Sequence, residues 1–283
     1  MPTAQELLDK FGTVKTLPHV ALRLTKLISN EKTSIVEFER VIKADPTLVL
    51  RLLHVVNSPF FGLRQKVDNI SRAVVFVGMK NLRNLVVTTA LKSVYKESHP
   101  VKFFSRSILW LHSAAVSICG QMISERIFNR AGDDVYLCGI LHDIGMIVED
   151  QVVQDLFLET CKTNRSNTKS FIEHEREVIG ADHCEIGHLL ACDWNLPVDV
   201  QEGILLHHNT DQKISPDSTA GIIQTADYMV CKLNYPAIPE VTPILSKDLA
   251  MYLKDNIGEY KALAKDLPDE MEKAKELHEQ KGD

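Results

Sequence analysis

The chain has 283 residues, of which 45% are hydrophobic and 25% are charged, and this composition is typical of a soluble globular protein. Its net charge of −6 at pH 7 argues against a protein that binds nucleic acid over its whole surface, because phosphates attract positive charge. The length allows one large helical domain or two smaller ones that share an interface. The six cysteines form no Cys-x-x-Cys pair, so we expect buried, reduced thiols.

The sequence shows no targeting or membrane-spanning segment. Residues 1–12 are polar and amphipathic, without the apolar core of a signal peptide. No stretch approaches the roughly 18 consecutive apolar residues that a membrane span requires. We therefore expect a cytoplasmic protein that makes no membrane contact.

Apolar residues recur at helical spacing through the first hundred positions. Asp45 and Pro46 separate two predicted helices, because proline disfavours helix in the preceding residue and suits the first turn of the next helix. Residues 70–78 are β-branched enough for a strand, but their spacing also fits a buried helix closed by Gly78. We expect a helix there, because the neighbouring segments are helical. The predicted helices of this region occupy residues 20–29, 33–45, 46–58, 70–78 and 80–95.

A polar stretch with a proline at residues 96–104 marks the predicted boundary between two lobes. The segments expected after it are a long helix over 103–128, a helical stretch over 133–161, and helices over 170–180, 183–194, 197–208 and 218–235. The charged C-terminal end is expected to be a solvated helix with a frayed terminus. The sequence thus predicts an all-α, two-lobed helical bundle, divided into residues 1–100, 101–236 and a C-terminal helical extension over 237–283.

Histidines and aspartates recur on successive predicted helices of the second lobe. Asp143 and Asp227 have apolar neighbours in the sequence, and a buried carboxylate costs several kcal/mol without a cation or donor. Helices that converge on a bundle core can gather ligands from distant positions, and imidazole with carboxylate suits Fe, Mn, Ni or Zn. We therefore predict one or two divalent transition metals. The candidate ligands are His112, His142, Asp143, His183, His207, His208 and Asp227.

Single members of this set also fit simpler roles. A lone His112 is more often a core histidine with a satisfied hydrogen bond, and a His207–His208 pair often just ends a helix. His188 is expected to be structural because it points to another helix face, and His174 is expected to be solvated. The order of the whole set on successive helices favours the metal site over these simpler roles.

This order and spacing resemble the HD-domain superfamily of metal-dependent phosphohydrolases. His112, His142, Asp143 and Asp227 match its four core positions. His183 and the pair His207–His208 match the extra ligands of its binuclear branch, which includes the HD-GYP cyclic-di-GMP phosphodiesterases. Three further segments make the chain resemble the HDOD family, the HD-related output domain, from about residue 17 to 235. They are "DPTLVLRLLHVVNSPFFG" (45–62), "ISRAVVFVGMKNLRNLVV" (70–87) and "GADHCEIGHLLACDWNLP" (180–197).

The resemblance implies a bacterial signal-transduction module, with an N-terminal helical lobe packed on an HD-like lobe that carries the metal site. Two departures from the HD-GYP enzymes bear on catalysis. Met146 stands where those enzymes place a lysine that meets substrate phosphate, and no Gly-Tyr-Pro loop follows His208. Phosphoryl hydrolysis needs cationic help for the charged oxygens, so we do not expect cyclic-di-GMP hydrolysis.

Two functions remain open. The preferred one is a regulatory module of HDOD type, non-catalytic, with a retained metal site. The alternative is an active phosphohydrolase in which Asp143 bridges two metals and the substrate is a phosphomonoester, nucleotide or cyclic nucleotide. The expected partners are signalling proteins or a small phosphorylated or nucleotide ligand, and the oligomeric state is left open.

Two features of the first lobe are less informative. A thin basic cluster could bind nucleic acid, but we expect it to form a solvated face instead. Its members are Arg64, Lys66, Arg72, Lys80 and Arg83. In the segment "NSPFFG" (57–62), the phenylalanines are expected to fill the interface between lobes, while Asn57 and Ser58 satisfy the turn.

Overall fold

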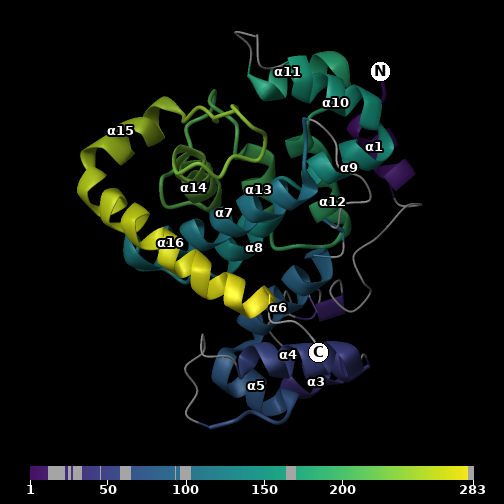
Figure 1. Cartoon of the computed structure of the whole chain (residues 1–283), viewed down its shortest axis with the longest axis vertical. Coiled ribbons are helices and arrows are strands. Elements are labelled where there is room, and N and C mark those ends of the chain that lie inside the picture. The colour runs from purple at the N-terminus through teal and green to yellow at the C-terminus, as the bar shows by residue number, and fades with distance from the viewer. Residues whose placement is uncertain are drawn as a thin grey trace.

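The computed structural model describes residues 1–11, 23–24, 27, 34–44, 46–57, 65–92, 94–95, 103–163 and 170–279, and this part of the chain contains helices and no strand. The predicted all-α fold is confirmed. Figure 1 shows the helices in a smaller group, formed by early parts of the sequence, and a larger one above it. The helix expected at 20–29 and the phenylalanines of 57–62 lie largely outside the described residues.

The smaller group contains four described helices, of which α3 and α5 have caps. They are α3 (Ile35–Lys43), α4 (Pro46–Val56), α5 (Ile70–Val77) and α6 (Met79–Lys92). Ser34 and Glu37 form a capping box at the start of α3. Gly78, with φ of 86°, closes α5, which confirms a helix in the β-branched stretch. The Asn57 side chain bonds the backbone of Leu53 and Val67, and so satisfies the turn as predicted.

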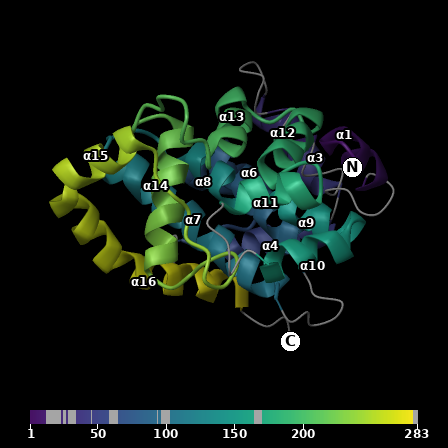
Figure 2. The ribbon, with the colours of Figure 1, turned by 90° about the horizontal axis from the view of Figure 1, so that it is seen from above.

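The larger group surrounds one long central helix, α7 (Arg106–Arg126), which Figure 2 shows between α14 and the helices around α9. Its other members are α8 (Asp133–Leu141), α9 (Ile144–Val152), α10 (Gln154–Thr163), α11 (Phe171–Val178), α12 (His183–Asp193), α13 (Val198–Leu206) and α14 (Thr219–Lys232). Among the described helices only α7 is long and apolar enough to cross a membrane, but 61% of the stretch concerned is buried in the protein. A helix at the centre of a bundle is apolar on all sides because neighbouring helices bury all of its faces.

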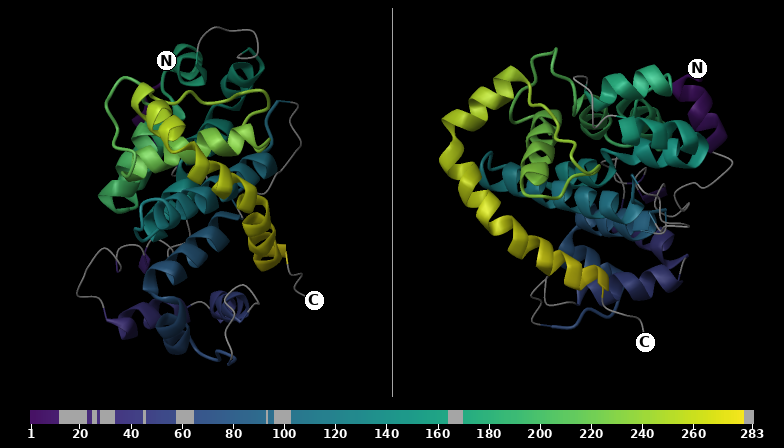
Figure 3. Two further views of the ribbon diagram at one scale, coloured as in Figure 1. Left: turned by 90° about the vertical axis from the view of Figure 1, so that its left-hand side faces the viewer. Right: turned by 45° about the horizontal axis from the view of Figure 1, so that its top comes forward.

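The first and the last described helices both pack on the larger group. The N-terminal helix α1 (Ala4–Phe11) packs against α9 and α12, beyond the predicted boundary at residue 100. At the other end, α15 (Lys247–Asp255) leads into α16 (Ile257–Glu279), which packs along α7 (Figure 3). The expected C-terminal helix is present, but it buries one face up to Met271 and is not solvated on all sides.

The contact between α6 and α8 contains an ion pair that corrects the prediction for the basic cluster. Arg83 was expected on a solvated face, but it is completely buried and donates to Asp134 at 2.8 Å. Lys80, which is half exposed, pairs with the same carboxylate at 2.7 Å. The prediction failed for Arg83 because its partner lies 51 residues away in the sequence. Of the other members, Lys66 is exposed, Arg72 pairs with Asp68, and Arg64 lies outside the described residues.

Candidate metal centre

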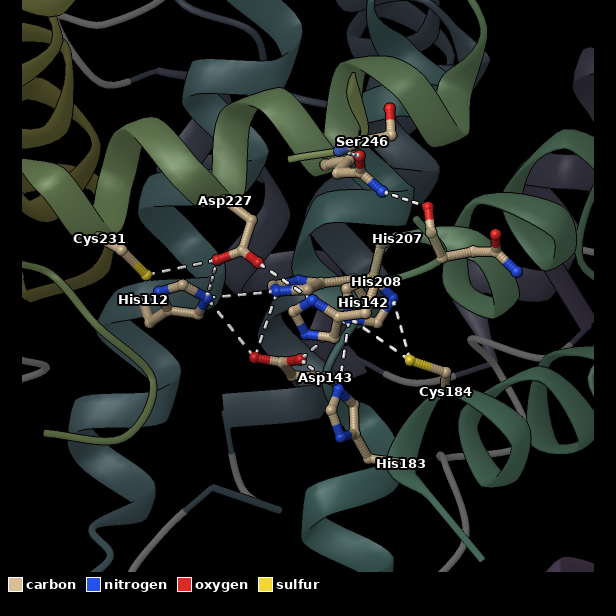
Figure 4. A network of polar contacts seen from close by, with 12 residues as sticks. His112, His142, Asp143, His183, Cys184, His207, His208, Asp227, Cys231 and Ser246 are labelled. Atoms are coloured by element: carbon tan, nitrogen blue, oxygen red, sulfur yellow. Dashed lines mark hydrogen bonds and ion pairs between the residues drawn. The ribbon is translucent and has the colours of Figure 1, made fainter. Parts of the chain in front are cut away.

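Five positions of the larger group bring the predicted ligands together (Figure 4). The seven side chains come from the middle of α7, the junction of α8 and α9, the start of α12, the end of α13 and the middle of α14. In the same order they are His112; His142 and Asp143; His183; His207 and His208; and Asp227. Their ligand atoms form overlapping groups in which all atoms lie within 4.8 Å of one another. The structure therefore gathers the complete predicted set.

Two glycines allow the backbones to approach closely enough for this convergence. A Cβ atom on Gly139 would lie 2.5 Å from the Cα of Ser117, so α8 can contact α7 only without a side chain there. A Cβ on Gly145 would lie 2.1 Å from the carbonyl oxygen of His183. The Gly145 position therefore fixes the distance between the start of α9 and the start of α12. These two helix starts carry Asp143 and His183.

Asp143 lies at the centre and offers each carboxylate oxygen to a different pair of imidazoles. Its Oδ2 lies 3.5 Å from Nε2 of His112 and 3.2 Å from Nε2 of His142. Its Oδ1 lies 3.3 Å from Nε2 of His183 and 3.4 Å from Nε2 of His207. All five side chains are at most 2% exposed. This is the arrangement of a carboxylate that bridges two neighbouring ligand groups.

The outer nitrogen of each of these imidazoles is held by an acceptor. Nδ1 of His112 donates to the Tyr235 carbonyl oxygen at 2.7 Å. His142 and His207 donate in the same way to carbonyls in the preceding turn, at 2.8 and 2.7 Å. Nδ1 of His183 meets the Glu175 carboxylate at 2.8 Å. Because a carbonyl can only accept, the Nδ1 atoms carry protons, and in the neutral rings the inward Nε2 atoms are free to bind.

The inward nitrogens lie close to one another in pairs. Nε2 of His112 is 3.2 Å from that of His142, and Nε2 of His183 is 3.4 Å from that of His207. Only one proton can lie between the two nitrogens of each pair. Oδ1 of Asp143 is buried and has no hydrogen-bond donor among the described residues. Unpaired inward lone pairs around a buried carboxylate are what a divalent cation satisfies, so the donor set fits a metal ion.

Asp227 and His208 complete the two halves of the cluster. Oδ1 of Asp227 lies 3.3 Å from Nε2 of His112, and Oδ2 lies 4.0 Å from Nδ1 of His208. The sulfur of Cys231, one helical turn beyond Asp227, lies 3.5 Å from the Asp227 carboxylate. The His112 half therefore contains a thiol near the candidate ligands, which the sequence pattern alone did not reveal.

The pKa shifts show that the cluster needs positive charge. Burial alone would raise the pKa of Asp143, but His142 and then His183 and His207 hold it well below its usual range. The pKa of Asp227 falls to about 2 because His112 outweighs the effect of burial. Burial would lower the pKa of His207, but Cys184 and Asp143 raise it to about 10. Protons or metal ions can supply this positive charge.

A pair of buried glutamates lies behind His183, and the sequence pattern did not predict it. Glu175, on α11, is completely buried and accepts from both the backbone and the ring of His183. Glu149, on α9, lies against Glu175, and its carboxyl oxygens meet no donor among the described residues. Burial, followed by the charge of Glu175, raises the pKa of Glu149 well above its usual range. A protonated Glu149 can then donate to Glu175, which orients His183.

The remaining histidine predictions have mixed outcomes. His174 was expected to be solvated but is only 8% exposed, because α11 packs on α10, where its ring contacts the Thr163 hydroxyl. Nδ1 of His188 bonds the Gln201 carbonyl oxygen at 3.1 Å, in keeping with the structural role expected of it. Of the cysteines, four are buried and all six are free thiols, as predicted.

A small cavity opens onto the cluster. Its volume is about 130 Å³, and its floor contains Asp143, His208 and Asp227. Met146, which stands at the lysine position of the HD-GYP enzymes, is part of the wall. The segment after α14, residues 237–244, and the start of α11 also line the cavity. None of the described residues that line the cavity is a lysine or an arginine.

Comparison with known proteins agrees with the fold. The model of the HDOD domain family matches residues 14–210, and the chain belongs to this family. An uncharacterized protein of Treponema pallidum (strain Nichols) is 27% identical over 228 residues, which is 80% of this chain. The chain spans 43% of the length of that relative.

Solved structures with low sequence identity share the fold. A phosphohydrolase-like protein of Shewanella amazonensis SB2B superimposes with a TM-score of 0.71 at 24% identity, and the match covers 96% of this chain and 97% of that one. A protein of Marinobacter aquaeolei VT8 assigned to signal transduction has a TM-score of 0.70 at 18% identity, with coverage of 95% and 59%. At these identities the likeness concerns the fold alone.

Proposed function

We propose that this protein is a regulatory module of HDOD type that binds one or two divalent transition metals and does not hydrolyse phosphoesters. One metal would be held by His112, His142, Asp143 and Asp227. The second would be held by His183, His207 and His208, with Asp143 shared between the two. The presence of two acceptor oxygens on Asp143, each facing two imidazoles, supports the two-metal arrangement.

The non-catalytic assignment rests on the absence of a positively charged side chain among the described residues that line the cavity beside the cluster. A divalent metal would supply Lewis acidity and activate water, but a phosphoryl group also needs cations or donors for its other oxygens. Met146 occupies the wall of the cavity, and no described lining residue carries a positive charge. Bound metal would then serve to order the cluster and to hold a ligand, in a protein that acts through signalling partners in the cytoplasm.

The experiment that tests this proposal combines metal analysis with an activity screen. Protein purified without chelators should contain one to two transition-metal ions per chain. The same sample, supplemented with Mn²⁺ or Fe²⁺, should show no turnover of phosphomonoesters, nucleotides or cyclic dinucleotides above that of an Asp143→Asn control. Rapid turnover that this substitution abolishes would instead establish the second candidate, a metal-dependent phosphohydrolase, for which the complete ligand set is the supporting observation.

A further inference from the structure

We infer that the cavity over the candidate metal centre binds a short aliphatic carboxylate of about four to six non-hydrogen atoms, and not a nucleotide. This inference rests on the proposed metal site, because the floor of the cavity is built from its ligands. It names the class of small molecule to which the module would respond. Three properties of the cavity carry it: size, the chemistry of the wall and the charge of the floor.

The size of the cavity limits the part of a ligand that it can enclose. At about 130 Å³ it is slightly smaller than a cavity of about 150 Å³ that accommodates benzene, which has six carbon atoms. Pockets for drug-sized ligands and cofactors measure about 300–1,000 Å³. A nucleotide, with more than about 20 non-hydrogen atoms, would leave most of its atoms outside this space. Ile244, at the outer wall, is 67% exposed, so a small molecule has a route from solvent.

The wall of the cavity is mostly apolar. Phe171 and Ile172 at the start of α11 line it, together with Ile238 and Val241 from the segment of residues 237–244. The Ser170 side chain is engaged in the cap of α11, so it is not available to a ligand. Such a wall favours an aliphatic chain, because burial of each methylene tightens binding about fourfold.

The floor selects the head of the ligand. With two divalent ions bound among neutral imidazoles, the two carboxylates Asp143 and Asp227 would leave the whole cluster with a net charge of about +2. This charge calls for an anion. A phosphate group carries a charge of about −1.5 to −2 and has three acceptor oxygens, which need several donors or cations. A carboxylate carries one negative charge and has only two acceptor oxygens. Since the described wall contributes no cation, the carboxylate is the better match.

The test uses the full chain loaded with Co²⁺, whose visible absorption reports on its ligands. Titration with acetate, propanoate, butanoate, pentanoate and hexanoate should shift the spectrum with an affinity that rises about fourfold per methylene and levels off near butanoate. Butanamide, inorganic phosphate and AMP should bind at least tenfold more weakly than butanoate. The Val241→Trp variant should keep acetate binding and lose the gain from longer chains, whereas Met251→Trp, on exposed α15, should behave as the wild type.

The possible failures have separate signatures. If the protein takes up no Co²⁺, the metal centre itself is refuted, and the ligand proposal falls with it. If the Co²⁺ spectrum is present but the carboxylate affinities do not depend on chain length, only the ligand proposal is overturned. Tighter binding of phosphate or AMP than of butanoate overturns the ligand proposal as well, and would indicate a phosphorylated ligand instead.

Discussion

The hydrogen bond behind each imidazole is the residue-scale feature that turns a group of histidines into a candidate ligand set. The sequence predicted which side chains converge, because a recurring His–Asp order on successive helices is typical of metal sites in helical bundles. It could not predict the tautomers. These depend on carbonyl groups such as that of Tyr235, 123 residues from its partner His112, and on a glutamate that no motif marks.

Glu175 offers the clearest test at this scale. Its carboxylate accepts from Nδ1 of His183, and loss of such a support usually lowers metal affinity about 10- to 100-fold. The Glu175→Gln variant should therefore bind Mn²⁺ or Zn²⁺ about 10- to 100-fold less tightly in the half of the cluster that contains His183, as measured by calorimetric titration. Glu185→Gln, on the exposed face of α12, is the matched control. Equal metal affinities of the two variants would show that Glu175 does not support the metal centre.

Close contacts between helix ends determine the geometry at the scale of elements. The helical pattern predicted the helices on either side of Asp143, but not that the chain turns there and presents the carboxylate at the start of α9. The reason is physical: periodicity reports which face of a helix is apolar, not the distance between two helix ends. That distance depends on Gly145, whose significance appears only when the His183 carbonyl is seen beside it.

The Gly145→Ala substitution tests this contact. The added methyl group would meet backbone at 2.1 Å, so α9 and α12 must separate, at a cost of about 1–3 kcal/mol in the free energy of unfolding. Metal affinity should fall with it, because Asp143 and His183 move apart. Gly258→Ala, in α16 with nothing within 4 Å, should leave stability unchanged or raise it slightly. Urea denaturation measures both, and equal curves would contradict the proposed packing.

The whole molecule depends on long-range contacts that the sequence did not disclose. The fold class and most helices were predictable from apolar spacing and caps. The packing of α1 on α9 and α12, and the path of α16 along α7, were not, because surface complementarity across the chain leaves no local pattern. The ion pair between the buried Arg83 and the partly exposed Asp134 belongs to this class and joins the two groups of helices.

This ion pair predicts both a loss of stability and its pH dependence. Burial alone would raise the pKa of Asp134, but Lys80 and Arg83 lower it. The folded pKa thus lies below the unfolded value near 4, so the stabilisation is present above about pH 5 and is lost as the pH falls through the folded pKa.

The Asp134→Asn variant should lose about 2–3 kcal/mol at pH 7, because it leaves Arg83 buried without its charge partner. Thermal and urea unfolding between pH 3 and 7 should show the gap to the wild type narrowing below about pH 4. The Lys80→Ala variant, at a half-exposed position, should lose less than about 1 kcal/mol. A pH-independent gap would mean that packing, and not charge, accounts for the effect.

The central claim is that the imidazoles around Asp143 hold metal, and anomalous X-ray diffraction from crystals soaked in Mn²⁺ or Fe²⁺ tests it most directly. One or two anomalous peaks are expected beside Asp143. One should be bounded by the Nε2 atoms of His112 and His142, and the other by those of His183 and His207. Crystals that show no peak there under saturating metal, or only peaks on the protein surface, would contradict the account.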